Sequence, residues 1–293
     1  MERFIQNWLN HLFVFESPPH WRAPYLEIDE LFPRRKQFEA HWKDIRDEAL
    51  AVCNNRSKLI RPYQDVAPRA VKSLINYAKQ VGDRKIDYWK TVILRFYNQQ
   101  YPEVIAACPK TAAVLEKFPE IEIAMFSVME PGATIPVHRG ILRSVFRYHL
   151  PLIVPGYDLE GRPNTPRYNE SQGQVSIVIG EDLSKQLGVI RQGRPTNMIN
   201  LAESREVHET RRYYWEPGQG MLFDDTYAHS VLNHHPSNRR RIVLLCDLRR
   251  PVPPGALGIG SALFSLLKWT GIPELVFYWN GKREKAVYRT KRN

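Results

Sequence analysis

From residue 121 onward the sequence consists of short apolar runs separated by glycine and proline, and this pattern limits the fold more than any other feature of the chain. The runs read IAMFSV, YHLPLIVP, VSIVIG, GMLFD and RIVLLCDL. Apolar runs of this length, bounded by turn residues, are typical of β-strands, and several in succession are typical of an antiparallel barrel or a jelly roll. We therefore predict a mainly β core over residues 119–252.

The N-terminal region, residues 1–118, is predicted to be mixed but rich in helix. Its apolar residues recur at helical spacing, and Ser17, Pro18 and Pro19 end the first such pattern. Helices are expected over residues 2–15, 35–53, 66–80 and 111–117. The apolar stretch at 92–97 fits either a strand or a helix.

Two further segments differ from the core in composition. Residues 156–212 form a long polar stretch with several Gly, Pro and Asn, which predicts an insertion that serves as a lid or substrate loop. The tail, residues 253–293, is apolar at first but is interrupted by a lysine, a proline and a glutamate, and it ends in a basic run. A membrane-spanning helix tolerates such interruptions poorly. The tail is therefore expected either to lie on an anionic membrane surface or to dock on the core as a helix.

The chain is strongly basic, with 42 Lys and Arg against 31 Asp and Glu and a formal net charge of +11. This balance favours an anionic partner, such as an acidic peptide, a small dianion or a phospholipid surface. No known nucleic-acid-binding motif is present, so a nucleic acid is not the expected partner. Three widely separated cysteines and the lack of a secretory signal favour a cytoplasmic or cytoplasm-facing protein, with membrane association left open.

Two histidines stand where a metal site in such a core is expected. His138 follows a Pro-Gly turn and a short strand-like run, and His229 lies just past another such run in LFDDTYAHSVLN. Two imidazoles at strand ends suit iron(II) that keeps open positions for other ligands. The chain has nine histidines, however, so a structural role for this pair stays the simpler alternative.

Arginines lie on the neighbouring strand-like runs. Arg147 and His149 alternate along one run and so share one face of a strand, which would point both into the core. Arg241 lies on a later run, and an arginine there would suit the carboxylate of a ligand. Because Arg241 is the last of three consecutive arginines, periodicity alone favours a solvated charge run instead.

Four segments of the chain, in order and at compatible spacing, resemble the aspartyl/asparaginyl β-hydroxylase family, including its bacterial lipid A hydroxylase branch. They are FPRRKQFEAHWKDIRDEALAV near residues 32–52, CPKTAAVLEKFPEI, the block from Phe126 to Pro155, and YYWEPGQGMLFDDTYAHSVLN through RIVLLCDLRRP. The resemblance covers about half of the chain. It implies a double-stranded β-helix of the cupin-like kind and an enzyme that uses Fe(II), 2-oxoglutarate and O2 to hydroxylate an unactivated carbon.

The resemblance also implies roles for individual residues. His138 and His229 look like the iron ligands, and Asp225 looks like a catalytic acid beside the iron that would hold a water molecule. The 2-oxoglutarate pocket would be formed by Ser127, Arg147, His149 and Arg241. For Arg241, its place in the strand that follows the second ligand outweighs the solvated alternative.

The chain departs from the usual iron-oxygenase pattern at Gly140, two residues after the first histidine, where a carboxylate ligand is common. The lipid A branch carries Asp there, whereas the animal-type aspartyl hydroxylases tolerate Gly. This position therefore favours an Asp or Asn side chain of a peptide or protein as substrate. A lipid acyl chain stays the alternative, supported by the apolar and basic tail. Halogenation at the open position and a non-catalytic binding module on the same fold are further alternatives.

Overall fold

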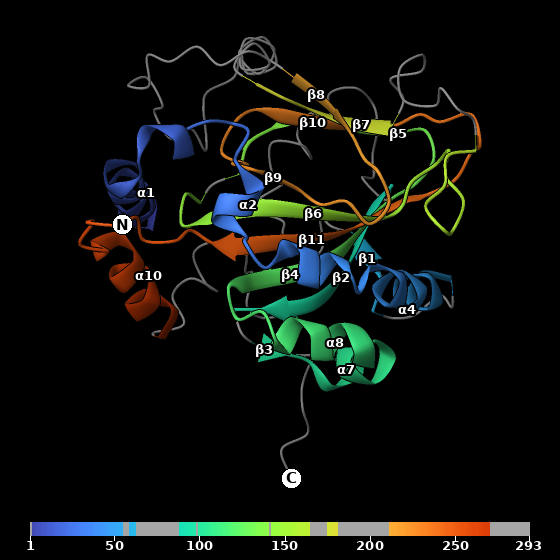
Figure 1. The fold of residues 1–293 in the computed structure, drawn as a ribbon, viewed down its shortest axis with the longest axis horizontal. Coiled ribbons are helices and arrows are strands. Elements are labelled where there is room, and N and C mark those ends of the chain that lie inside the picture. Colours follow the sequence, from blue (N-terminus) through green and yellow to red (C-terminus); the bar gives the residue numbers. More distant parts are fainter. Residues whose placement is uncertain are drawn as a thin grey trace.

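The core consists of two antiparallel β-sheets in a computed structural model that describes residues 2–54, 59–62, 88–97, 99–140, 142–164, 175–180 and 211–269 (Figure 1). The larger sheet has the strand order β1-β2-β4-β11-β6-β9, with β3 paired to β2, and the smaller sheet has the order β5-β10-β7-β8. The large-sheet strands are β1 (Arg61–Pro62), β2 (Trp89–Phe96), β3 (Gln99–Gln100), β4 (Ile121–Met129), β6 (Val145–Ile153), β9 (Met221–Phe223) and β11 (Arg241–Arg249). The small-sheet strands are β5 (Ala133–His138), β7 (Val175–Ile179), β8 (Arg211–Tyr214) and β10 (His229–Asn233).

The chain passes back and forth between the two sheets as it runs from β4 to β11. Strands β4, β6, β9 and β11 belong to the large sheet, whereas β5, β7, β8 and β10 belong to the small one. This is the order of a double-stranded β-helix, a jelly roll built from two facing sheets. The predicted mainly β core is therefore confirmed. The two sheets remain separate in their hydrogen bonding among the described residues and do not close into a barrel.

Alternation along the strands divides the apolar residues into two clusters, one on each side of the large sheet. On β6, Phe146, Tyr148 and Leu150 belong to the outer cluster, which packs against the helices. On β11, Val243 and Leu245 belong to the inner cluster, which fills the space between the sheets. The residues that alternate with the outer cluster, Arg147 and His149 on β6 and Arg241 and Asp247 on β11, therefore face the interior, where the candidate site lies.

The helices cover the outer face and one end of the large sheet (Figure 1). Helices α4, α7 and α8 lie on the outer face, while α1 and α10 lie together at the end of the molecule. The helices are α1 (Glu2–Glu16), η1 (Pro19–Trp21), α2 (Ile28–Leu31), α3 (Arg35–Glu39), α4 (Trp42–Asn54), α7 (Pro102–Ala107), α8 (Pro109–Glu116) and α10 (Ile259–Trp269).

Most of the predicted elements of the N-terminal region agree with these bounds. The first and last expected helices correspond to α1 and α8, and the expected helix over 35–53 is divided into α3 and α4. The ambiguous stretch at 92–97 belongs mostly to strand β2, and the expected helix over 66–80 lies outside the described residues.

The segment predicted as an insertion, residues 156–212, includes a strand of the core. β7 lies inside it and pairs with both β10 and β8, so the small sheet depends on this segment. Residues 165–174 and 181–210 lie outside the described residues, and for them a lid stays a prediction. The VSIVI run of β7 forms a strand because it lies centrally in the small sheet, where the backbone N–H and C=O groups along both of its edges find hydrogen-bond partners.

The beginning of the tail docks on the first helix. α10 packs against α1, as the core-docked alternative predicts, yet part of its apolar surface stays exposed. None of the helices in the described ranges combines the length and the hydropathy that crossing a membrane requires. The three cysteines, Cys53, Cys108 and Cys246, are buried and unpaired.

Candidate active site

The two predicted metal ligands face each other on adjacent strands of the small sheet. β5 ends at His138 and β10 begins at His229, and the two residues are direct partners in the antiparallel ladder. Their imidazole rings lie 4.1 Å apart, centroid to centroid, at 52° to each other. Sequence positions ninety-one residues apart are thereby brought to one point, close enough for both rings to contact a single ion.

The state of His229 suits metal binding. Its Nδ1 donates a hydrogen bond to the carbonyl oxygen of Tyr227 at 2.9 Å, which leaves Nε2 as the atom with a lone pair for a metal. Burial lowers the pKa of His229 well below its ordinary value, and the neighbouring His138 acts in the same direction. A neutral imidazole with a fixed tautomer is the form that coordinates metals.

Asp225 occupies the space beside Gly140, where many iron oxygenases place a carboxylate ligand. A Cβ added at Gly140 would collide with the carboxylate of Asp225, and the amide N–H of Gly140 donates to the backbone carbonyl of Asp225 at 2.6 Å. Burial raises the pKa of the Asp225 carboxyl above its ordinary value, against the lowering effect of Arg147. Residue 140 has no carboxylate of its own, and the carboxylate of Asp225 fills the space that a side chain at position 140 would occupy.

Arg147 lies on the inner face of β6 and is held between two carboxylates. Its Nη1 contacts Oδ2 of Asp225 at 2.6 Å, and its Nε and Nη2 donate to both carboxylate oxygens of Asp247 at 2.9 and 3.1 Å. A forked arrangement of this kind orients the guanidinium plane as well as stabilising its charge. Arg147 is therefore a fixed cation next to the candidate metal position.

A row of aromatic rings connects the histidine pair to the deeper part of the site. Phe223 lies 5.5 Å from His229 and 5.2 Å from His149, and His149 lies 6.1 Å from Trp215, centroid to centroid. The guanidinium of Arg241 stacks over the Trp215 ring at 4.7 Å. The predicted residues His149 and Arg241 are therefore brought into one site with the histidine pair.

Three buried side chains at the far end of this row have polar atoms that find no hydrogen-bond partner among the described residues. The unpaired atoms are both ring nitrogens of His149, Nε1 of Trp215 and Nε of Arg241. Buried polar groups are nearly always hydrogen-bonded, because leaving one unpaired costs about 1–3 kcal/mol. Clustered orphan donors of this kind indicate a site that is completed by an acceptor ligand.

Arg241 is the most unusual of the three. Its side chain is 1% exposed, and within the described part of the chain no carboxylate pairs with it; its Nη2 only approaches Sδ of Met129 at 3.5 Å. Burial lowers its pKa to about 9, and no acid among the described residues counters this effect. An arginine that is kept charged in such a place is suited to bind the carboxylate of a ligand.

Ser127, the remaining predicted pocket residue, lies on the inner face of β4. Its Oγ accepts a hydrogen bond from Nε1 of Trp89 at 3.0 Å, and the Trp89 ring lies 6.2 Å from that of His138. Ser127 therefore contacts the site through Trp89, on the side of the histidine pair.

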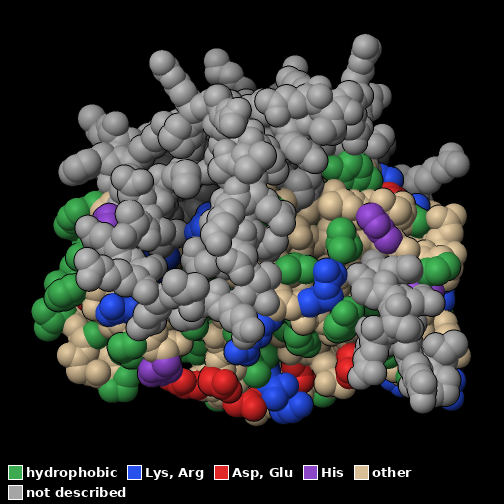
Figure 2. Space-filling view, turned by 90° about the horizontal axis from the view of Figure 1, so that it is seen from above, with side chains coloured by type: hydrophobic (Ala, Val, Ile, Leu, Met, Phe, Trp, Pro, Cys, Tyr) green, Lys and Arg blue, Asp and Glu red, His purple; other side chains and the backbone are tan. Residues whose placement is uncertain are grey.

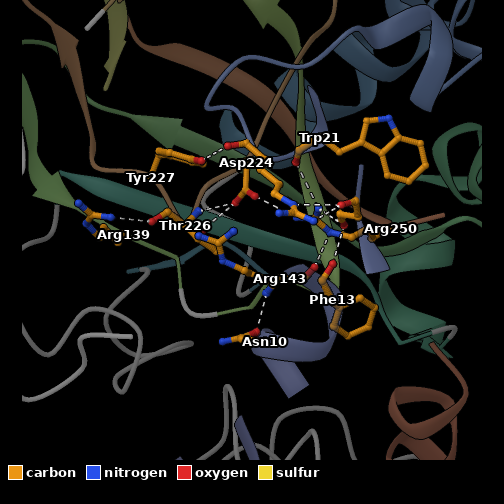
Figure 3. Close-up of polar contacts among 11 residues, drawn as sticks. Asn10, Phe13, Trp21, Arg139, Arg143, Asp224, Thr226, Tyr227 and Arg250 are labelled. Atoms are coloured by element: carbon orange, nitrogen blue, oxygen red, sulfur yellow. Dashed lines mark hydrogen bonds and ion pairs between the residues drawn. The ribbon is translucent and has the colours of Figure 1, made fainter. Parts of the chain in front are cut away.

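A second buried arginine holds the loop that carries Asp224 and Thr226 and leads into β10 (Figure 3). Arg250 pairs with Oδ2 of Asp224 at 2.9 Å and donates to the carbonyl oxygen of Arg143 at 2.6 Å and to Oγ of Ser17 at 3.1 Å. Asp224 in turn accepts from the amide N–H and the hydroxyl of Thr226 at 3.0 and 2.6 Å. The loop before the second histidine is thereby fastened to the end of α1.

The donor set fits iron(II) with a bidentate organic acid. Among the described ranges there is no group of three or more His, Cys, Asp or Glu side chains that could enclose a metal by themselves. Two imidazoles with open positions on the ion are the arrangement that lets a cosubstrate and oxygen bind as well. The unpaired polar atoms of Arg241, Trp215 and His149 are linked to this pair through the Phe223 ring and are suited to bind the carboxylate of such an acid.

The sequence alone did not identify several members of the site. Asp247 shares the inner face of β11 with Arg241, so period-two alternation along that strand could have found it. Trp215 lies in the loop before β9, and Arg250 and Asp224 form a contact between distant segments; no local pattern marks these three residues.

The family model for aspartyl/asparaginyl beta-hydroxylase matches residues 39–178 and 199–251, more than half of the chain. The chain belongs to the aspartyl/asparaginyl β-hydroxylase family. It is 28% identical over 239 residues to the ornithine lipid ester-linked acyl 2-hydroxylase of Rhizobium tropici, covering 82% of this chain and 65% of that protein. It is 24% identical over 256 residues to the human aspartyl/asparaginyl beta-hydroxylase, covering 85% of this chain and 25% of that protein.

The chain spans less than two thirds of the length of these curated relatives. Among solved structures, it matches a Pseudomonas putida prolyl-4-hydroxylase at a TM-score of 0.34 and 13% identity, over 83% of this chain and 99% of that one. A 2OG-Fe(II) oxygenase family protein from Burkholderia pseudomallei matches at a TM-score of 0.32 and 10% identity, over 57% of this chain and 71% of that one. The assignment to the family rests on the family model, and the fold rests on the strand order itself.

Proposed function

We propose that this protein is an Fe(II)- and 2-oxoglutarate-dependent dioxygenase that hydroxylates an unactivated carbon atom. The observation that carries the proposal is the buried Arg241, unpaired by any described carboxylate and linked to two facing imidazoles by a row of packed rings. His138 and His229 would hold the iron, and Arg241 would bind the distal carboxylate of 2-oxoglutarate. When bound, iron and 2-oxoglutarate together with O2 supply the oxidising chemistry, while the protein supplies position and electrostatics.

The remaining residues of the site prepare it for these ligands. Trp215 and His149 offer buried polar atoms to the cosubstrate, and Ser127 holds Trp89 beside the first histidine. Arg147, oriented by its two carboxylates, places positive charge near the metal position, where the 2-oxo acid end of the cosubstrate is negative. Asp225 fills the space next to Gly140 and accepts hydrogen bonds there, so it is suited to hold a water molecule beside the iron.

Two substrate classes are supported by different observations. A fatty acyl chain of a membrane lipid is supported by the relative from Rhizobium tropici, of which this chain covers the larger share, and a peripheral contact with an anionic membrane would follow from it. An Asp or Asn side chain of a peptide or protein is supported by Gly140 and by the human relative. A basic protein would attract either an acidic peptide or an anionic lipid.

Succinate release from 2-oxoglutarate tests the proposal. Protein reconstituted with iron(II) without oxygen and then exposed to air is expected to release succinate, and His138→Ala and His229→Ala are expected to abolish both release and iron binding. His234→Ala, a change to an exposed histidine outside the site, serves as the matched control and should retain both. Wild-type protein that neither binds iron nor turns over would instead support a non-catalytic binding module.

The same assay separates the substrate classes. Succinate release is compared after addition of an ornithine lipid in detergent micelles and after addition of an Asp- and Asn-containing peptide, and the product is analysed by mass spectrometry for one added oxygen. Stimulation by the lipid alone would exclude the peptide class, and stimulation by the peptide alone would exclude the lipid class.

A further inference from the structure

Exposed large apolar side chains are concentrated on one part of the molecule. Of the eight such residues in the described ranges, six lie on α1, on α10 or in the segment that leads into α10. They are Trp8, Phe15, Val252, Leu257, Ile259 and Leu266, which we call the α1–α10 face. Hydrophobic side chains gather along the left edge of Figure 2, the side on which Figure 1 places α1 and α10. A gathering of this kind on a folded protein marks an interaction surface.

Helix α1 is anchored to the core by its other side. Asn10 accepts a hydrogen bond from the amide N–H of Arg143 at 2.8 Å, Phe13 is buried, and Ser17 just beyond the helix contacts Arg250. Trp8 and Phe15 lie seven residues apart, on one side of the helix, and Phe15 is 83% exposed. The helix is therefore fixed by a few polar and apolar contacts while it presents aromatic rings to the outside.

Helix α10 is held beside it in a defined position. Glu16 accepts hydrogen bonds from the amide N–H groups of Ile259 and Gly260 at 2.7 and 3.0 Å, which caps the start of α10. A Cβ at Gly260 would lie 3.5 Å from the Phe13 ring, so the two helices approach closely there. Leu257, just before the helix, is 86% exposed. The exposed apolar residues of both helices thus belong to one fixed surface rather than to two independent segments.

The charge of the sequence that follows α10 indicates the chemical nature of the partner. The chain that continues from α10 carries six basic residues and one acidic residue in its last twelve positions: Lys282, Arg283, Glu284, Lys285, Arg289, Lys291 and Arg292. An apolar and aromatic face on a chain with a net charge of +11 and a basic C-terminal sequence fits the surface of an anionic bilayer, where rings enter the headgroup boundary and cations are attracted to the lipid phosphates.

We infer that the α1–α10 face docks on an anionic phospholipid bilayer. The inference goes beyond the proposed function, because it holds whichever substrate class the enzyme uses. Docking brings this end of the molecule to the membrane while the Arg250 contacts keep α1 fastened to the loop that precedes His229.

Flotation with vesicles tests the inference. The full chain, without added iron or 2-oxoglutarate, is mixed with vesicles of equal parts phosphatidylethanolamine and phosphatidylglycerol, or of phosphatidylcholine alone. We expect binding to the anionic vesicles that weakens as salt is raised. The double variant Phe15→Glu/Leu257→Glu is expected to bind about tenfold or more weakly, because each side chain would lose its apolar burial in the bilayer.

The matched control is Ile105→Glu, which changes an exposed apolar residue on α7, away from the α1–α10 face. It should bind as the wild type does, and circular dichroism of all variants should show the same fold. Unchanged binding of the double variant, an equal loss in the control, or no binding of the wild type to anionic vesicles would overturn the inference. Because no iron is present, failure here is separate from failure of the oxygenase assay.

Discussion

Two arginines at opposite ends of one strand are both fully buried, and their surroundings differ in the one respect that matters for function. Arg250, directly after β11, has a carboxylate, two carbonyl oxygens and a hydroxyl within hydrogen-bond distance. Arg241, at the start of β11, has an indole ring and a thioether, and no carboxylate from the described residues. Burial lowers the pKa of both, to about 10 for Arg250, where Asp224 opposes the effect, and to about 9 for Arg241.

This difference shows how a fold separates a structural cation from a functional one. Burying an ion pair is tolerable when its hydrogen bonds are complete, and then the pair mainly specifies which segments meet. Burying an unpaired cation costs stability and is retained where a ligand supplies the missing anion. Arg250 thus fastens a loop, whereas Arg241, under the proposed function, would be left to bind the cosubstrate. Each of the following changes should affect one of these roles and spare the other.

The largest effect is expected from Asp224→Ala, which leaves Arg250 without its carboxylate. Breaking a buried pair by removing one partner costs about 3–5 kcal/mol in the free energy of unfolding. Urea denaturation followed by circular dichroism measures this change. The milder Asp224→Asn should retain part of the stability, because its side-chain oxygen still accepts hydrogen bonds from Thr226.

The control for this prediction is Glu160→Ala, which removes an exposed carboxylate that pairs with Lys43 on the surface. Exposed pairs contribute little, so this variant should unfold close to the wild type. A similarly small change in Asp224→Ala would mean that Arg250 does not depend on its partner, and the contrast with Arg241 would be lost.

The opposite result is expected from Arg241→Met. Loss of a charge-assisted pair inside a buried site weakens binding by about 2–5 kcal/mol, so the affinity for 2-oxoglutarate should fall about 30-fold to several thousand-fold. Stability without ligand should be equal to that of the wild type or higher, because an unpaired buried charge has been removed. Calorimetric titration of the anaerobic iron(II) protein and urea denaturation measure the two quantities.

Arg240→Met is the matched control, since Arg240 is the preceding residue and points outward to Glu130. It should leave 2-oxoglutarate binding unchanged. If Arg241→Met bound 2-oxoglutarate normally, the distal carboxylate would have another partner; if it unfolded as readily as Asp224→Ala, Arg241 would be a structural residue after all.

The same arginines show which parts of the site were accessible from the sequence. Alternation along the strand-like runs predicted that Arg147 and His149 share an inward face, and the jelly-roll core followed from the succession of short apolar runs. For Arg241 the local pattern favoured solvent, because three arginines occur in a row; in the fold Arg240 points outward and Arg241 inward, as alternation requires. Only the resemblance to a family favoured a buried position for Arg241 over the solvated alternative.

The remaining parts depend on contacts between distant segments. Arg147 and Asp247 are one hundred residues apart in the chain and meet because β6 and β11 are neighbours in the sheet, in a register that places these two residues opposite each other. VSIVI was recognised as a strand-like run, yet β7 was included in the 156–212 insertion, because its five residues, four of them apolar, lie between two long polar stretches. No local sequence pattern marks Trp215 as part of the site, because its position there depends on packing against His149 and Arg241.

A third arginine sharpens the comparison and gives the smallest expected effect. Arg147 is paired like Arg250 yet lies in the site like Arg241, and its ion pair with Asp225 depends on the absence of a side chain at Gly140. Gly140→Ala would force the Asp225 carboxylate away from Arg147. Overpacking of this kind costs about 1–3 kcal/mol in the free energy of unfolding, and iron affinity should fall with it.

A double-mutant cycle decides whether this contact is the cause. Asp225→Ala removes the group with which the new methyl collides, so Gly140→Ala should cost little when Asp225→Ala is already present, and the two changes should be clearly non-additive. Urea denaturation of the wild type, the two single variants and the double variant gives the coupling free energy. Additive effects would show that the space beside Gly140 is not held by Asp225, and Arg147 would then belong with Arg250 as a purely structural cation rather than beside the metal with a role of its own.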